Sequence, residues 1–163
     1  KVLKIEGRGR AADYVATVIK TYREAIDSYY EGTFTKEKIN IWMEALATVY
    51  NRGFWSGYYL GQKLGEWSDN PGSNATQKKV YVGKGMHYFP KSNIAEFKIE
   101  AYDIKKGDKI LITGPSTGAQ ELILEDFFVN DATSEKATKG DSCTLKVPFR
   151  IRLSDKMYKI VEN

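Results

Sequence analysis

The period of the hydrophobic pattern changes part-way along this chain of 163 residues. Over the first 50 residues, apolar side chains recur every three or four positions, which places them on one face of an α-helix. Beyond residue 79 they alternate with polar residues in short runs, as in 95–101, and this is the period of a half-buried β-strand. We therefore predict an α+β protein with its helices first and its strands second.

The helical half is predicted to contain two helices. The first starts at Asp13, an acidic residue suited to a first turn, and ends just before Gly32. Thr33 or Thr35 can cap the second helix, which the polar residues 51–53 stop. The short connection between the helices favours antiparallel packing.

Turns rich in Gly and Asp divide the second half into short β-type runs. The predicted strands are 80–88, 94–101, 109–113, 120–129, 142–147 and 157–161. Six short strands predict a small closed or nearly closed barrel, because closure removes the exposed edges that an open sheet of this size would leave. A Lys-Gly-Asp turn occurs at both 106–108 and 139–141, which fits a barrel of two similar halves.

A stretch rich in Gly, Ser, Asn and Asp separates the two halves, and we interpret 62–78 as a linker. The predicted domains are then 1–61, with a strand, two helices and an aromatic segment, and 79–163, the small barrel. Since no run approaches the ~20 apolar residues that span a bilayer, we expect a soluble protein with no membrane partner.

The chain offers few side chains for covalent or metal catalysis. It has one histidine, His87, and one cysteine, Cys143, so a zinc site of His and Cys ligands cannot be completed within it, and no metal or cofactor is predicted here. Cys143 is expected to be a buried thiol, with a reactive thiol as the alternative, and His87 to be half-buried. A lone cysteine without a disulfide partner fits a reducing compartment, so we predict a cytoplasmic protein.

The first ten residues combine a short apolar run with a charged turn. Residues 2–5 are predicted to form a buried strand. Glu6 then lies at its end, and Arg8 and Arg10 lie in a loop that feeds the first helix, a geometry that collects anions. These three residues are candidates for the rim of an active site, and the alternative is an ion-pair network that caps the helix. The catalytic residues themselves stay unassigned.

Two further surfaces are candidates for recognition. The aromatic segment 54–59, with Phe54, Trp55 and Tyr58 as candidates, is either a stacking surface for nucleobases or part of the core. The net charge of +4 permits contact with RNA or another anionic partner. The candidate phosphate contacts are Lys78, Lys79, Lys84, Lys105, Lys106 and Lys109. Solvated turn residues are the alternative for these lysines.

Several segments, in order, resemble peptidase family U32, the collagenase-like proteins. Residues 3–8, 14–15 and 22–27 are similar to the last strand and last helix of that family's TIM-like barrel, and the Arg-Gly-Phe-x-x-Gly segment 52–57 is similar to the part that follows it. Three motifs are similar to the family's small C-terminal β-barrel: Tyr81-Val82-Gly83, Lys106-Gly107-Asp108 and Gly114-Pro115. The resemblance covers almost the whole chain.

The resemblance implies a C-terminal fragment of a larger protein, cut at the last strand of a TIM-like barrel and ending in a translation-factor-like barrel. We expect this fragment to be inactive alone, with any metal or iron–sulfur cluster of the parent bound upstream. Its implied partners are the missing TIM-like domain and a protein substrate or, alternatively, the RNA of a tRNA or rRNA base hydroxylation protein. An unpaired strand at 2–5 also predicts strand swapping or a homo-oligomer.

Overall fold

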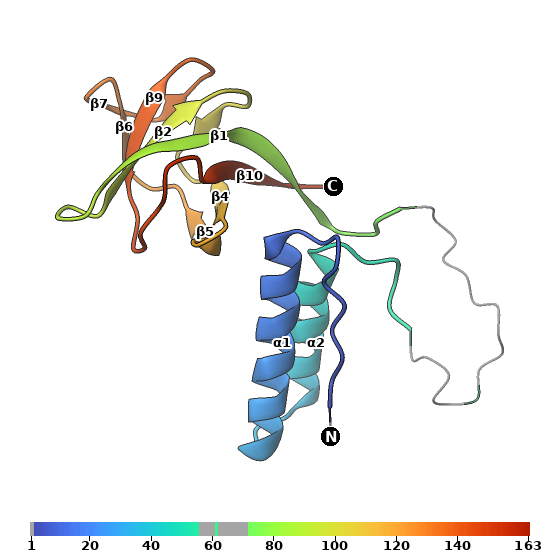
Figure 1. Ribbon diagram of the computed structural model, residues 1–163. Helices are drawn as coiled ribbons and strands as arrows, with labels where there is room; N and C mark the ends of the chain where they lie inside the picture. The colour runs from blue at the N-terminus through green and yellow to red at the C-terminus, as the bar shows by residue number, and fades with distance from the viewer. Residues whose placement is uncertain (1, 56–60, 62–71) are drawn as a thin grey trace. The chain divides into compact units, whose positions relative to one another are not determined.

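The computed structural model describes residues 2–55, 61 and 72–163, and the chain divides into two compact units. Unit 1 comprises residues 1–78 together with Asn163, and unit 2 comprises residues 79–162. Figure 1 shows the two helices of unit 1 and the strands of unit 2. The assignment of catalytic and accessory roles to domains stays a prediction.

Unit 1 is built around two helices, as predicted. α1 spans Ala12–Tyr30 and α2 spans Lys36–Ala47. Of the two threonines considered as the second cap, Thr35 has this role, because its hydroxyl oxygen accepts a hydrogen bond from the Lys38 N–H at 3.3 Å. α2 ends a few residues earlier than predicted, with Thr48 as its C-cap.

Gly32 shapes the connection between the two helices. Its φ of +70° is a conformation that residues with a Cβ rarely adopt. The Thr33 N–H then donates to the Ser28 carbonyl at 2.8 Å and the Gly32 N–H to the Tyr29 carbonyl at 3.3 Å, as in a Schellman motif. The Lys38 ammonium donates to the hydroxyls of Ser28 and Thr33, at 2.9 Å each, and so ties the two helices together. α1 and α2 therefore lie side by side as a hairpin (Figure 1).

The predicted apolar faces of the helices are only partly buried. Val18 of α1 and Trp42 of α2 are buried, and the Trp42 ring centre lies 5.3 Å from that of Phe34. Ile19 and Tyr30, which the same period assigned to the buried face, are 51% and 82% exposed. A wide apolar stripe needs more than one neighbouring helix to cover it, and each helix here has only one in the described part of unit 1.

The predicted strand at 2–5 does not form. The residues before α1 have no regular secondary structure, and the Val2 side chain is 93% exposed. A strand needs a neighbour that satisfies its backbone N–H and C=O groups, and no strand within the described residues pairs with this segment. The segment instead makes a turn, in which the Arg10 N–H donates to the Gly7 carbonyl at 3.0 Å.

Unit 2 is a mostly antiparallel β-structure. Its strands are β1 (Gln77–Phe89), β2 (Ile94–Ile99), β3 (Ile104–Lys105), β4 (Lys109–Gly114), β5 (Gly118–Ile123), β6 (Phe127–Val129), β7 (Ala132–Ser134), β8 (Lys136–Ala137), β9 (Ser142–Lys146) and β10 (Lys156–Glu162). Eight of them form one sheet in the order β5-β4-β10-β1-β2-β9-β6-β7, and β3 pairs with β8.

The predicted number of six strands is wrong. The run 120–129 contains parts of two strands, β5 and β6, separated by a short break. The strands β3, β7 and β8 were missed because each is only two or three residues long, too short to display a period of two. Closure of the eight-stranded sheet into a barrel stays a prediction.

The core of unit 2 comes from alternate positions of the strands. β2 has the predicted alternation, with Ala95, Phe97 and Ile99 buried and the residues between them partly exposed. The same buried cluster takes residues from the other strands and loops: Val82, Ile104, Ile110, Ile112, Leu124, Phe127, Ala137, Cys143, Leu145, Val147, Ile151 and Met157. Unit 2 thus has one continuous hydrophobic core of its own.

The two Lys-Gly-Asp turns have the same structure. In each, the Asp carboxylate accepts a hydrogen bond from the backbone N–H three residues earlier, at 2.8 Å for Asp108 and 2.7 Å for Asp141. The strands that precede the turns, β3 and β8, pair with each other and place Ile104 opposite Ala137. The repeat in the sequence therefore corresponds to a local pseudo-twofold arrangement, in which equivalent residues face each other.

Gly83 allows β1 and β2 to approach closely. A Cβ at this position would lie 1.9 Å from the carbonyl oxygen of Lys98. The obstacle is backbone that is held in the sheet, so it cannot turn aside as the end of a side chain can. Only glycine fits this point of the β1–β2 ladder.

We expect Gly83→Ala to lower the free energy of unfolding by about 3 kcal/mol or more, because the two strands must separate. Urea unfolding followed by circular dichroism measures this loss. Gly107→Ala is the control, since its Cβ meets nothing within 4 Å and its cost comes only from a φ of +87°, about 1 kcal/mol. Equal losses in the two variants would contradict the steric explanation.

Cys143 is completely buried, and this desolvation is the main cause that raises the pKa of its thiol to about 12. The folded chain should therefore resist thiol-modifying disulfide reagents near neutral pH and react fully in urea. Because the unfolded thiol loses its proton first, the stability contributed by the protonated thiol is intact near neutral pH and is lost as the pH rises toward 12. Cys143→Ala should remove that part of the pH dependence. Rapid modification of the folded chain would refute the buried-thiol interpretation.

Candidate functional site

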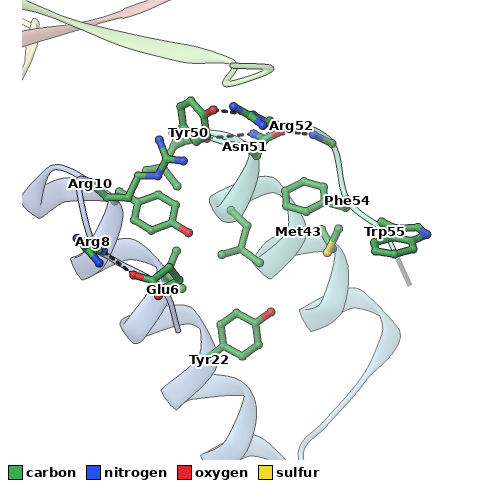
Figure 2. A pocket seen from close by; sticks show the side chains of 15 residues that line it. Glu6, Arg8, Arg10, Tyr22, Met43, Tyr50, Asn51, Arg52, Phe54 and Trp55 are labelled. Carbon is green, nitrogen blue, oxygen red and sulfur yellow. Dashed lines mark hydrogen bonds between the residues drawn. The ribbon is translucent and has the colours of Figure 1, made fainter. Parts of the chain in front are cut away.

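A pocket of about 750 Å³ in unit 1 lies between the N-terminal segment with α1 on one side and α2 with the residues after it on the other (Figure 2). It brings together two groups that the sequence had singled out separately. Glu6, Arg8 and Arg10 line it from the N-terminal segment, and Phe54 and Trp55 line it from the segment after α2. The third aromatic candidate, Tyr58, lies outside the described residues.

The N-terminal wall of the pocket is held by local backbone interactions. The Arg8 N–H donates to a carboxylate oxygen of Glu6 at 2.9 Å. Gly9 takes a φ of +71°, which turns the chain toward α1 and places Arg10 at the entrance of the helix. Arg8 therefore contacts Glu6 through its backbone, and the alternative considered for this turn, a network of side-chain ion pairs, is not found among its described residues.

Tyr50 lines the opposite wall and contacts two arginines. The Arg10 guanidinium carbon lies 3.6 Å from the centre of the Tyr50 ring, a close cation–π contact. Arg52 Nε donates to the Tyr50 hydroxyl oxygen at 2.9 Å. This phenol thus lies against two guanidinium groups, one on its face and one at its oxygen (Figure 2).

The turn after α2 presents Tyr50 and Arg52 to the pocket. The Asn51 amide nitrogen donates to the Val49 carbonyl at 3.0 Å, and its side-chain oxygen accepts a hydrogen bond from the Gly53 N–H at 3.1 Å. Gly53 has a φ of +91°, so the chain reverses here without the strain that a Cβ would cause. The Asn51 side chain is therefore bonded to the backbone on both sides of this turn and stabilises it.

The lining is cationic at one end and apolar elsewhere. Three arginines and one carboxylate, Glu6, are among the lining residues, which leaves an excess of positive charge. Val18, Met43 and Leu46 supply aliphatic surface between the two walls. A lining of this kind suits a ligand that has both an anionic group and an apolar body.

Sequence reasoning missed Tyr50 and Arg52 as site residues. The recurrence of apolar residues every three or four positions also places Tyr50 on the apolar face of the second helix. Arg52 was interpreted only as part of the helix stop and of a family motif. The sequence signal for this site is the spacing of Tyr50 and Arg52 in a turn that ends at Gly53. Such a spacing is common and does not by itself indicate a binding site.

The candidate lysines do not form one set of free cations. Lys79 lies 5.4 Å from the centre of the Tyr158 ring, and Lys78 and Lys105 are exposed. The other three pair with carboxylates at 2.7–2.9 Å: Lys84 with Glu100, Lys106 with Asp126, and Lys109 with Glu121. Exposed pairs of this kind add little to stability, but a phosphate would have to compete with them for the ammonium groups.

The two residues considered for metal or thiol chemistry have different environments. Cys143 is in the core, whereas His87 is exposed rather than half-buried, with its ring centre 4.4 Å from that of Phe89. Among the described residues, no group of three or more His, Cys, Asp or Glu side chains is placed to hold a metal ion. The expectation that any metal or iron–sulfur cluster of the parent is bound outside this fragment stays a prediction.

No helix in the described part of the chain is long and apolar enough to cross a membrane.

The two arginines also lower the pKa of Tyr50, with the hydrogen bond from Arg52 as the largest cause. We expect Arg52→Gln to raise the pKa of Tyr50, because the phenolate loses its nearest cation. Phenolate absorbance during a pH titration, with Tyr50→Phe as the reference, reports this group. Arg23→Gln is a matched control, since Arg23 is exposed on α1 and bonded to Asp27. An unchanged titration in Arg52→Gln would disprove the contact.

Comparisons with known proteins relate this chain to one family. The model of peptidase family U32 matches residues 1–69. A collagenase of Porphyromonas gingivalis is 51% identical over 159 residues, which cover 98% of this chain and 38% of that protein. A tRNA hydroxylation protein of Bacillus subtilis is 30% identical over 139 residues, which cover 84% of this chain and 32% of that protein.

A solved structure is also similar. It is the C-terminal domain of a Geobacillus thermoleovorans protein described as a U32 peptidase, with 19% identity, a TM-score of 0.46, and coverage of 48% of this chain and 96% of that one. The chain spans only about a third to two fifths of the length of the curated relatives that it matches. On the family model and the 51% identity with a collagenase, this chain belongs to peptidase family U32.

Proposed function

We propose that this chain is the recognition part of a collagenase-like U32 peptidase, with unit 2 as an accessory domain that binds the protein substrate or a protein partner. The observation that carries this proposal is the extent of the similarity. The family model ends at residue 69, yet the alignment with the P. gingivalis collagenase has 159 residues and so continues through unit 2. A unit that accompanies the family-defining segment without being part of it fits an accessory role.

The construction of unit 2 supports this role. A continuous core gives it a rigid scaffold, and rigid scaffolds commonly present binding residues on their loops and hairpins. The end of the β1–β2 hairpin exposes large apolar side chains, with Met86 41% and Phe89 44% exposed. Large apolar side chains that stay exposed near the end of a hairpin are suited to binding protein.

The remaining features of the proposal concern the whole protein. Residues 2–30 would belong with a TIM-like catalytic barrel, whose strands and catalytic groups come from outside this chain. The sheet of unit 2 would close as a translation-factor-like barrel. The protein would act in the cytoplasm, and any metal or iron–sulfur cluster would be held outside the residues of this chain.

Binding to immobilised denatured collagen tests the proposal. We expect the chain and its residues 79–163, which contain a complete core, to bind with similar affinity, and the pair of changes Met86→Ser and Phe89→Ser to weaken binding about tenfold. Leu153→Ser is the control, because Leu153 is an exposed apolar residue of the same unit outside the hairpin. No binding by residues 79–163, or equal losses in the hairpin and control variants, would count against the proposal.

A second candidate function is binding of RNA in a base hydroxylation protein. The observation that favours it is the similarity to the B. subtilis tRNA hydroxylation protein, whose 139 aligned residues also continue into unit 2. Lys78 and Lys105 are the best phosphate candidates, because both are exposed and neither is ion-paired with a described carboxylate.

If this second function holds, affinity for transfer RNA should fall steeply with salt concentration, because phosphate contacts release counterions. Lys105→Glu should weaken binding, whereas Lys146→Glu, a change at another exposed lysine of unit 2, should have a smaller effect. Filter binding at several salt concentrations measures both. A salt-independent affinity, or none, would exclude the RNA function.

A further inference from the structure

Beyond this proposed function, we propose that the pocket of unit 1 binds a small organic anion with an apolar body, whose carboxylate or phosphate is held by Arg10, Arg52 and the Tyr50 hydroxyl. The site is separate from the surface of unit 2 on which the proposed function rests. A test of ligand binding in this pocket is therefore independent of the tests of collagen and RNA binding.

The two guanidinium groups leave donors for a ligand. Arg10 contacts the Tyr50 ring through its face, and its N–H groups point outward from the edge of the guanidinium plane. Arg52 uses its Nε–H on the Tyr50 hydroxyl, which leaves the two terminal nitrogens of its fork. Neither arginine forms an ion pair with a carboxylate of the described residues. An anion would supply the partner that both lack there.

Tyr50 adds a third donor and keeps the two arginines in place. Its oxygen accepts the hydrogen bond from Arg52, so its own proton is directed away from that guanidinium and is available to an acceptor in the pocket. Its ring is the surface on which Arg10 lies. The arrangement is thus assembled before any ligand binds, which lowers the ordering cost of binding.

The remainder of the pocket suits an apolar body. Val18 and Leu46 are buried or half-buried, whereas Met43 and Phe54 line the same pocket with much of their surface exposed. A ligand that covered Met43 and Phe54 would remove apolar area from water, and this is the main source of affinity in small-molecule sites. The volume of about 750 Å³ lies in the ordinary range for such sites.

Glu6 limits the charge of the ligand. Its carboxylate is held in the lining by the Arg8 N–H, and it opposes the approach of a second negative group. The pocket should therefore hold a dianion less tightly than it would without this carboxylate. Removal of this carboxylate should favour a dianion most.

Isothermal titration of the chain with 4-phenylbutyrate, phenyl phosphate and the neutral 4-phenylbutyramide tests the site. We expect the carboxylate to bind at least about tenfold more tightly than the amide, since the amide cannot engage the arginines as an ion. The comparison of carboxylate with phosphate identifies which anionic group the site prefers. Equal binding of 4-phenylbutyrate and its amide, or no binding of any probe, would overturn the proposal.

Variants assign the effect to the named residues. Arg52→Gln and Tyr50→Phe should each weaken 4-phenylbutyrate binding about tenfold, and Glu6→Gln should strengthen phenyl phosphate binding severalfold. Arg23→Gln, which removes an exposed arginine outside the pocket, is the control and should change nothing. Tyr50→Phe retains the ring beneath Arg10, so it decides the question even if Arg52→Gln fails to fold. Equal losses in Arg23→Gln and Tyr50→Phe, or weaker phosphate binding in Glu6→Gln, would refute the assignment.

Discussion

The contact between the Arg10 guanidinium and the Tyr50 ring joins two parts of unit 1 that have no shared secondary structure. The segment before α1 is irregular, and its backbone is paired with no strand that the structure describes, so the Arg10 contact adds to the local backbone interactions that hold its turn. A guanidinium that lies flat on an aromatic face gives both attraction and a defined orientation. The walls of the pocket, and the placement of Glu6 within it, follow from this one contact and from the turn that presents Tyr50.

Unit 2 depends on a different constraint, the close approach of backbone to backbone. Gly83 permits this in the β1–β2 ladder, and a Cβ on Gly114 would lie only 1.8 Å from a carboxylate oxygen of Asp155. Asp155 is itself buried, and it accepts a hydrogen bond from the Arg152 N–H at 2.8 Å. Gly114 thus makes room for a buried carboxylate that satisfies loop backbone, whereas Gly83 makes room for the backbone of the neighbouring strand.

The features that sequence predicted well are those set by local interactions. The two helices, the Thr35 cap and the paired Lys-Gly-Asp turns depend on residues within a few positions of one another. The strand at 2–5 was predicted wrongly because an apolar run specifies a strand only when a partner strand exists. Tyr50 and Arg52 were missed because their roles depend on Arg10, some 40 residues away in the chain, and no periodicity reports such a contact. The short strands β3, β7 and β8 exist only through their pairing.

The burial of Cys143 has a practical consequence. It is the only cysteine in the sequence, and its thiol is enclosed in the core of unit 2. A cysteine introduced on the surface would therefore be the one accessible thiol of the folded chain, without any need to remove the natural one. A fluorophore or spin label attached at an exposed position such as Met43 would then report the occupancy of the pocket directly, in a background that contributes no signal of its own.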